Sequence, residues 1–143
     1  MSSEFAIDEM EVGHTFSPLV FPIHEELIAK YADTVGDRDP LHSNANWARR
    51  AGYRGIVAPP TIAALYVLKA YRTDCPPPRG GVHFRQRFKF HRPIVAGDVL
   101  TAQARVADKY VKKGKLFLVI ESTALNQEGE LVVWSESTSF WLE

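Results

Sequence analysis

The residues best suited to catalysis lie in one short segment, residues 36–42, whose sequence is Gly-Asp-Arg-Asp-Pro-Leu-His. Within it, Asp37 supplies a carboxylate and His42 an imidazole, a pair that exchanges protons readily near neutral pH. Pro40 disfavours helical backbone at Asp39, so the segment is expected to be an extended loop or a turn. A loop of this kind can direct Asp37 and His42 toward one point. The two residues therefore predict a general acid–base site.

The same segment also has an ordinary structural explanation. Aspartates in an Asp-x-Asp-Pro turn often bond to their own backbone, and His42 is placed to cap the helix that follows. On spacing alone, a plain turn is the more frequent outcome. The pattern by itself leaves both alternatives open.

Hydrophobic periodicity predicts the elements that hold this loop. A short strand at residues 19–23 comes first, and Pro22 places it at a sheet edge. A helix at residues 24–34 follows and stops at Gly36. Ser43 or Asn44 begins a second, short helix that runs to Arg50.

The most apolar helix is expected at residues 59–71, where no charged side chain precedes Lys69. A helix that is apolar all round is buried on all sides. After a break at residues 74–81, alternating patterns and the glycines 114 and 129 predict strands at 82–91, 99–109, 116–125 and 131–141. Residues 1–143 therefore predict one α+β domain, in which about five antiparallel strands wrap around one buried helix.

The composition excludes several classes of protein. The chain has 17 basic and 17 acidic residues among 143, so its charge favours neither nucleic acid nor a membrane surface as a partner. The single cysteine, Cys75, excludes an internal disulfide and is expected to be incidental. No metal-ligand spacing such as His-x-x-x-His occurs, and no cofactor is expected. The N-terminal residues lack the basic start and apolar run of a signal peptide, so a cytoplasmic protein is expected.

Alternation along residues 82–91 predicts two different faces of one strand. The apolar face carries Val82, Phe84, Phe88 and Phe90, and the basic face carries His83, Arg85, Arg87, Lys89 and His91. The basic face is either an ordinary solvated surface or a patch in which Arg85, Arg87 and Lys89 bind phosphates.

The remaining aromatic and histidine side chains carry weaker expectations. Trp47, Trp134 and Trp141 are expected in the core or in an interface, and His14 and His24 at the surface.

Four segments of the chain resemble one protein family. Residues 31–42, with Tyr-Ala followed by Gly-Asp-x-Asp-Pro-Leu-His, resemble the signature of the (R)-specific enoyl-CoA hydratases of the MaoC-like group. Residues 52–61 resemble the start of that group's central helix, residues 90–100 its strand-turn-strand segment, and residues 126–132 its last hairpin. The resemblance covers about residues 10–142. It implies the hot-dog fold.

The resemblance also implies a reaction. Members of the group add water to 2-enoyl thioesters, or remove it from (3R)-3-hydroxyacyl thioesters, and the resemblance assigns Asp37 and His42 as the catalytic pair. CoA or the phosphopantetheine arm of an acyl carrier protein enters as part of the substrate. A homodimer is implied, or a hetero-oligomer with a sister hot-dog subunit.

Two positions depart from the family pattern. Asp39 stands where the group usually has asparagine, which adds a charge beside the pair. Residues 58–60, Ala-Pro-Pro, replace a His-Gly pair whose glycine N–H binds the thioester oxygen, and prolines have no N–H. The nearest unblocked N–H at this helix start belongs to Thr61, which becomes the candidate oxyanion donor.

Two other functions stay open. A hot-dog thioesterase often takes a carboxylate from the central helix, but none lies between Thr61 and Tyr71. A catalytically idle, acyl-binding subunit of a dehydratase heterodimer is favoured by residues 58–60, because a sister branch without the acid–base pair resembles this chain there. Asp37 and His42 argue against that alternative.

Overall fold

An antiparallel sheet with the strand order β1-β3-β4-β5-β2 dominates the described part of the structure. The computed structural model describes residues 10–72 and 79–142, so Cys75 and most of the break expected at 74–81 lie outside the described residues. The strands are β1 (Leu19–Pro22), β2 (Val82–Phe90), β3 (Val99–Lys112), β4 (Lys115–Leu125) and β5 (Leu131–Leu142). The consecutive pairs β3–β4 and β4–β5 confirm the predicted meander.

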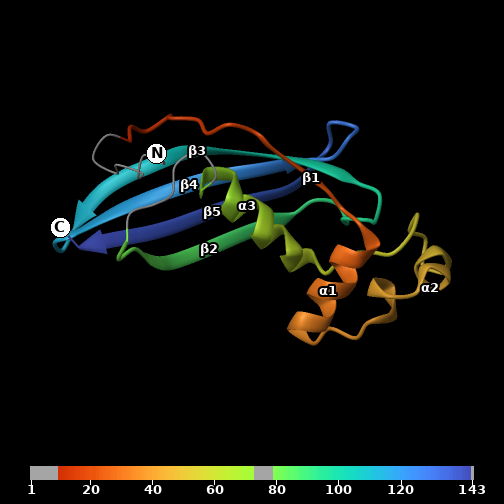
Figure 1. Cartoon of the computed structure of the whole chain (residues 1–143). Helices are drawn as coiled ribbons and strands as arrows, with labels where there is room; N and C mark the ends of the chain where they lie inside the picture. Colours follow the sequence, from red (N-terminus) through yellow and green to blue (C-terminus); the bar gives the residue numbers. More distant parts are fainter. Residues whose placement is uncertain (1–9, 73–78, 143) are drawn as a thin grey trace.

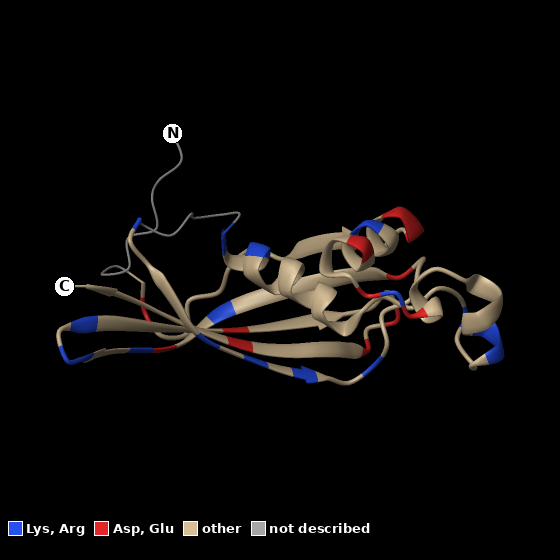
Figure 2. Ribbon diagram, turned by 90° about the horizontal axis from the view of Figure 1, so that it is seen from below, with Lys and Arg blue, Asp and Glu red and all other residues tan. Residues whose placement is uncertain are grey.

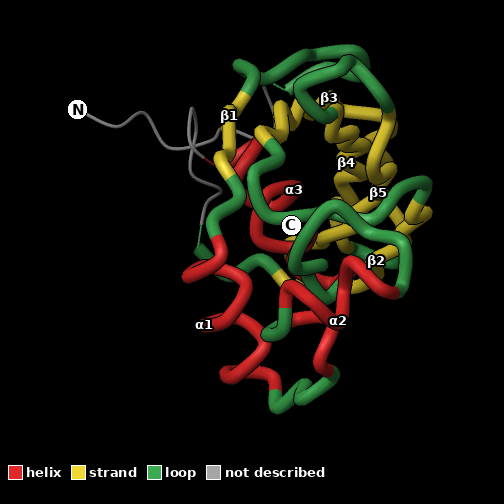
Figure 3. Tube along the Cα trace, turned by 90° about the vertical axis from the view of Figure 1, so that its right-hand side faces the viewer, coloured by secondary structure: helices red, strands yellow, loops and turns green. Residues whose placement is uncertain are grey.

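Three α-helices accompany the sheet in the described residues: α1 (Glu25–Val35), α2 (Ala45–Arg50) and α3 (Ala63–Arg72). Single 3₁₀ turns at Pro40–His42 and Pro60–Ile62 precede α2 and α3. In Figure 1, α3 runs along one face of the sheet, whereas α1 and α2 lie beyond one end of it. Figure 3, seen from that end, shows α1 and α2 gathered below the strands. The segment between α1 and α2 contains residues 36–42.

The core lies between α3 and the face of the sheet that we call the inner face. α3 buries Tyr66, Val67 and Ala70 against inner-face residues such as Leu100 and Ile120. The expectation that this helix is buried on all sides is wrong, because Leu65 is 39% exposed. The sheet covers only one side of α3, and on the other side Leu65 is left exposed by the part of the chain that the structure describes.

The two faces predicted for residues 82–91 are wrong at the start of β2, because the strand contains a bulge there. The pairing with β5 shifts between His83 and Arg85, so Phe84 is an extra residue. Its ring packs with Phe117 and Phe140, at centroid distances of 5.8 and 5.9 Å, on the side of the sheet away from α3, the outer face.

The same shift separates His83 from the basic residues that follow it. His83 pairs with Ser139, whose partner on β4 is the core residue Leu118. Arg85, Arg87 and Lys89 stay on the outer face, opposite the outer-face residues of β5. The predicted alternation therefore holds from Arg85 onward but fails before it.

The tryptophans do not share one environment. Trp47 on α2 is 51% exposed, so it lies outside the core of this chain. Trp141 packs against the core, and Trp134 lies half-buried beside Arg87 and Lys89. His14 and His24 are exposed, as expected.

Two negative findings concern the described residues, 10–72 and 79–142. They contain no helix long and apolar enough to cross a membrane. They also contain no group of three or more His, Cys, Asp or Glu side chains arranged to hold a metal ion.

Candidate active site

The loop between α1 and α2 begins at Gly36, which ends α1 in left-handed backbone with φ of 73°. Glycine adopts this conformation without steric cost, and it is the usual way for a helix to stop. The Asp37 N–H then donates to the Ala32 carbonyl at 2.9 Å. Asp37 is thus fixed to the end of α1 by its own backbone.

Asp39 and Asn44 hold the turn that follows. The Asp39 carboxylate accepts a hydrogen bond from the Leu41 N–H at 2.9 Å, and the Asn44 side chain accepts from the Trp47 N–H at 3.0 Å. The turn explanation therefore applies to Asp39, and it applies also to one oxygen of Asp37, which accepts from the Asp39 N–H. The cap of α2 is Asn44 rather than His42. These roles leave the His42 ring free for another contact.

Asp37 and His42 meet across this loop. Asp37 Oδ2 lies 3.1 Å from His42 Nε2, and Asp37 Oδ1 accepts from the Asp39 N–H at 3.1 Å. The His42 side chain is 8% exposed and that of Asp37 is 39% exposed. The imidazole is held inside the protein, whereas the carboxylate faces the surface.

The other nitrogen of His42 determines where its protons lie. Nδ1 is 2.6 Å from the carbonyl oxygen of Val57. A carbonyl only accepts hydrogen bonds, so Nδ1 carries a hydrogen. The contact between Nε2 and the Asp37 carboxylate is then a hydrogen bond only when the pair holds one further proton. The geometry therefore suits an imidazolium–carboxylate pair that stores one transferable proton.

An open pocket of about 300 Å³ lies in front of this pair. The α1 residues Ala29, Ala32 and Asp33 form one wall, and residues 36–39 with His42 and Ser43 form the other. Arg38 brings a cation to its rim. A water molecule or a small polar group can therefore reach Asp37 from solvent.

Val57 is a residue that sequence reasoning missed. Its carbonyl accepts from the His42 ring and its N–H donates to the Leu41 carbonyl at 2.9 Å, so the backbone of one residue holds both His42 and the residue before it. Backbone atoms do this work, so the valine side chain gave no signal. The segment around Val57 is held in turn by hydrogen bonds from Ala58 to Ile94 at 2.8 Å and from Ala96 to Ile56 at 2.9 Å.

Asp98 anchors the turn that pairs with Val57. Its carboxylate is 2% exposed and accepts from Arg54 at 2.6 Å, from the Val95 N–H at 2.9 Å and from Gln127 at 3.1 Å. The hydrogen bond to Asp98 raises the pKa of the Arg54 guanidinium. Because its donors come from Arg54, Val95 and Gln127, this buried carboxylate holds three loops together.

We expect Asp98→Asn to lower the free energy of unfolding by about 1–3 kcal/mol, because charge-assisted hydrogen bonds of a buried group are weakened. Urea unfolding measures it. Glu121→Gln is the matched control, since it breaks an exposed pair with Arg105 at 3.0 Å and should cost less than about 1 kcal/mol. Equal, small losses in both variants would contradict the anchoring role of Asp98.

Thr61 lies at the start of α3, beside α1. The first hydrogen bond of the turn is donated by Ile62 to the Pro59 carbonyl at 3.0 Å, so the Thr61 N–H precedes the intrahelical ladder. No described residue accepts from that N–H. The Tyr31 hydroxyl donates to the Thr61 hydroxyl at 2.8 Å and ties the two helices together.

Tyr66, further along α3, has a buried hydroxyl for which the described residues offer no hydrogen-bond partner. Burial raises the pKa of this phenol to about 12, with a smaller contribution from Tyr31. The Tyr66 hydroxyl is therefore protonated at neutral pH, and it is a buried hydrogen-bond donor without an acceptor among the described residues.

Arg85, Arg87 and Lys89 do not join this site within one copy of the chain. All three lie on the outer face of the sheet, and α3 lies on the inner face. Arg87 pairs with Glu136 at 3.3 Å, and Arg87 and Lys89 lie over the Trp134 ring at 5.6 and 5.2 Å. The structure thus brings together Asp37 and His42, places Thr61 on the neighbouring helix, and leaves the basic patch apart.

Comparison with known proteins gives consistent matches over most of the chain. A family model described as "FAS1-like, dehydratase domain region" matches residues 10–134. A UPF0336 protein from Saccharopolyspora erythraea is 34% identical over 139 residues, covering 92% of this chain and 89% of that protein.

Two solved structures share both the fold and more than a quarter of the sequence. The unliganded R-hydratase PhaJ1 from Pseudomonas aeruginosa has a TM-score of 0.84 and 26% identity, and the match covers 99% of this chain and 88% of that chain. The C-terminally truncated HadBC complex, a 3R-hydroxyacyl-ACP dehydratase from Mycobacterium tuberculosis, has a TM-score of 0.78 and 29% identity, covering 90% of this chain and 96% of that chain. The α+β hot-dog fold expected from the sequence is confirmed.

Proposed function

Since this chain belongs to the family of FAS1-like dehydratase regions, we propose that it catalyses reversible addition of water to 2-enoyl thioesters, giving (3R)-3-hydroxyacyl thioesters. The observation that supports this most is the Asp37–His42 contact at 3.1 Å with His42 Nδ1 fixed on Val57. The names of the R-hydratase and of the 3R-hydroxyacyl-ACP dehydratase support the R configuration.

The proposed reaction uses both members of the pair. Asp37, as carboxylate, takes a proton from a water molecule while the water oxygen forms its bond to C3. His42 orients that water, and its Nε2–H supplies the proton that adds to C2. The proton on Asp37 then returns to Nε2 across the 3.1 Å contact, which restores the starting state. Dehydration is the same sequence in reverse.

Negative charge that develops on the thioester oxygen needs a donor. We propose the N–H of Thr61, which stands at the N-terminus of α3 and has no acceptor among the described residues. The Tyr31–Thr61 hydrogen bond would hold this helix start against α1, which carries Asp37 at its end. In this proposal, the prolines at 59 and 60 shift the oxyanion donor along the chain to the Thr61 N–H, and the site keeps a donor.

The outer-face patch of Arg85, Arg87 and Lys89 is proposed to hold phosphates of a CoA or carrier-protein arm. Arg87→Ala should then raise KM for a CoA thioester with kcat nearly unchanged, the pattern of lost uniform binding. The difference should shrink as salt is added. Steady-state kinetics measure it, and an unchanged KM would make the patch an ordinary solvated surface.

The proposed assembly is a two-fold dimer. Within residues 10–72 and 79–142, no strand pairs with the edge of β2 that faces away from β5, and Phe90 on β2 is 47% exposed. Open strand edges and exposed apolar side chains favour pairing with a second copy. We expect a dimer by light scattering at micromolar concentration, dissociated by Phe90→Asp. Val20→Asp, on the opposite edge strand and 59% exposed, should leave it intact.

A strict monomer of the wild-type chain would contradict this assembly, unless a sister subunit restores it. The HadBC dehydratase was solved as a complex, which makes a hetero-oligomer the natural second form to test.

The two alternative functions make different products. A thioesterase releases a free thiol, which a thiol-reactive dye detects, whereas a hydratase leaves the thioester intact. An idle subunit gives neither product. Incubation of the protein with (3R)- or (3S)-3-hydroxybutyryl-CoA separates these cases, when the enoyl absorbance and free thiol are both followed. We expect the enoyl absorbance to appear with the 3R substrate alone, and we expect no thiol release. Thiol release, or equal use of both stereoisomers, would contradict the proposal.

A further inference from the structure

A second concave site lies on the outer face of the sheet, at the end remote from α1 and α2. It is a groove of about 430 Å³ between the start of β2, the β3–β4 hairpin and the end of β5. It shares no lining residue with the Asp37–His42 pocket. Its lining consists of the aromatic residues Phe84, Tyr110, Phe117 and Phe140, the cations Arg85, Lys112, Lys113 and Lys115, and Thr138.

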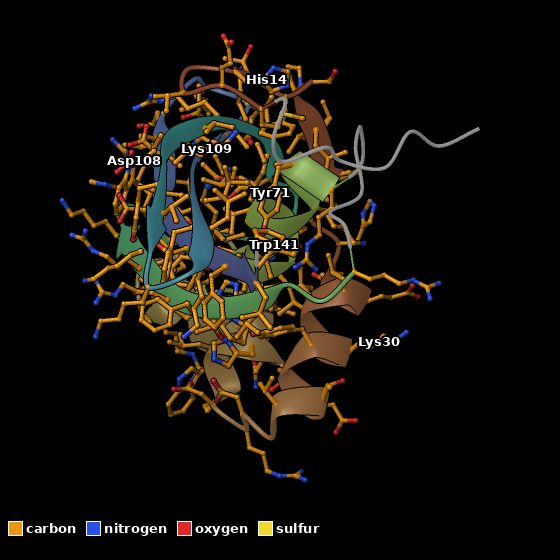
Figure 4. All side chains as sticks on the ribbon, turned by 90° about the vertical axis from the view of Figure 1, so that its left-hand side faces the viewer. His14, Lys30, Tyr71, Asp108, Lys109 and Trp141 are labelled. Atoms are coloured by element: carbon orange, nitrogen blue, oxygen red, sulfur yellow. The ribbon has the colours of Figure 1, made fainter. Side chains whose placement is uncertain are left out.

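Two bulges build the aromatic floor of this groove. The register shift in β2 turns Phe84 to the outer face. A second register shift, in β3 between Val106 and Asp108, determines which of the residues after it face outward and which face inward. Figure 4 shows the consequence: Asp108 points to the outside of the sheet, whereas its neighbour Lys109 points inside. Tyr110 therefore lies on the outer face, two positions after Asp108.

The rings form one continuous cluster. Tyr110 stacks on Phe117 at 5.0 Å with an angle of 8° between ring planes, and Phe117 contacts Phe140 at 5.4 Å. Phe84 is 55% exposed and Tyr110 is 37% exposed. Exposed, flat aromatic surface of this kind is costly in water and favours a planar partner.

Cations surround this aromatic floor. Lys115 Nζ lies 5.1 Å from the Phe140 ring, and the Arg85 guanidinium lies 5.9 Å from the Phe84 ring. None of the groove's four cations has an ion-pair partner in the part of the chain that the structure describes. In the ribbon of Figure 2, blue Lys and Arg positions gather at the β3–β4 hairpin tip, and red Asp and Glu positions occur on α1 at the other end. Among the residues that the structure describes, no carboxylate lines the groove.

These features together select the kind of ligand. A second copy docked by a two-fold axis would bring like charges of both grooves together, so charge opposes self-association. An acyl chain would use the rings but leave the cations without a role. An extended single strand of nucleic acid would next meet Glu121 and Glu136, which lie further along the same face and form ion pairs with Arg105 and Arg87. Its phosphates would have to compete with these two carboxylates for the arginines. A planar base joined to a compact anion satisfies both halves of the groove.

We propose that this groove binds a free nucleoside polyphosphate. Its base stacks against Phe84 and Tyr110, and its phosphates contact Lys112, Lys113, Lys115 and Arg85. The groove volume lies within the range of pockets that hold molecules of this size. The inference rests on the groove alone and does not depend on hydratase activity.

Titration of the purified chain with ATP by calorimetry tests the proposal. We expect a dissociation constant below about 1 mM, and weaker binding at high salt. Tyr110→Ala and the double variant Lys112→Ala with Lys115→Ala should each weaken binding about 10-fold or more. Lys30→Ala is the control, because this lysine lies on α1 and points into solvent (Figure 4). We expect this variant to bind ATP as the wild type does.

The competing ligands supply the contrary outcomes. Inorganic triphosphate that binds as tightly as ATP would reduce the groove to an anion patch and overturn the proposal. Binding of CoA without binding of ATP would also overturn it, and would assign the groove to the substrate's own nucleotide. An absence of ATP binding at millimolar concentration, or binding unchanged in Tyr110→Ala, would exclude the groove as a nucleotide site and leave the hydration proposal untouched.

Discussion

Asp37→Asn and His42→Ala are each expected to lower kcat for enoyl thioester hydration by about 100- to 10,000-fold, the usual contribution of a positioned acid or base. Asp37→Asn removes the acceptor of the water proton, and His42→Ala removes the Nε2 donor together with the bond to Val57. The double variant should be little slower than either single variant, because the two residues act as one unit. Stopped or continuous assays of the enoyl absorbance measure these rates.

Asp39→Asn is the matched control for this result. It makes the same carboxylate-to-amide change two positions away, and an asparagine oxygen can still accept from the Leu41 N–H, as Asp39 does at 2.9 Å. We expect nearly full activity. If Asp39→Asn abolished turnover while Asp37→Asn kept it, the catalytic carboxylate would be Asp39 instead.

Loss of the Thr61 N–H is expected to have the second largest effect. Replacing the peptide N–H of Thr61 by an ester oxygen, through incorporation of the matching hydroxy acid, should lower kcat by about 100- to 1,000-fold, as removal of one oxyanion donor does. The substitution changes one atom and leaves the Thr61 side chain and its hydrogen bond with Tyr31 in place.

Thr61→Val separates the N–H from the hydroxyl at the same residue. It keeps the backbone donor and loses the bond to the Tyr31 hydroxyl, so we expect only a small fall in kcat. A small effect of the ester combined with a large effect of Thr61→Val would show that the threonine side chain, rather than the N–H, is needed for catalysis.

Much of the architecture follows from periodicity. The strands of the meander and the helix at the end of which Gly36 stands have strong local patterns, and each of them forms at the expected place within a few residues. The loop at 36–42 was predictable because Gly36 can adopt the left-handed backbone that ends a helix, and Pro40 disfavours helical backbone at the residue before it. The local sequence therefore predicts that Asp37 and His42 lie in a loop directly after α1.

Other features depend on contacts that no local pattern shows. The bulge at Phe84 arises from the register between β2 and β5, which alternation within β2 cannot reveal. The fixation of His42 depends on the Val57 carbonyl, a group that every residue has. The exposed side of α3 at Leu65 follows from how far the sheet wraps around the helix. The cytoplasmic location and the absence of a cofactor stay predictions.

The most direct test of the central claim is turnover of enoyl thioesters by the purified wild-type chain. A panel of trans-2-enoyl-CoA thioesters from crotonyl to dodecenoyl, followed by loss of the enoyl absorbance, covers short and long acyl chains. The account predicts hydration of at least one member to the (3R)-3-hydroxyacyl product, and loss of that activity in Asp37→Asn. No turnover on any member, either alone or mixed with a sister subunit, would contradict it and would make this chain the idle subunit that Ala58-Pro59-Pro60 suggests.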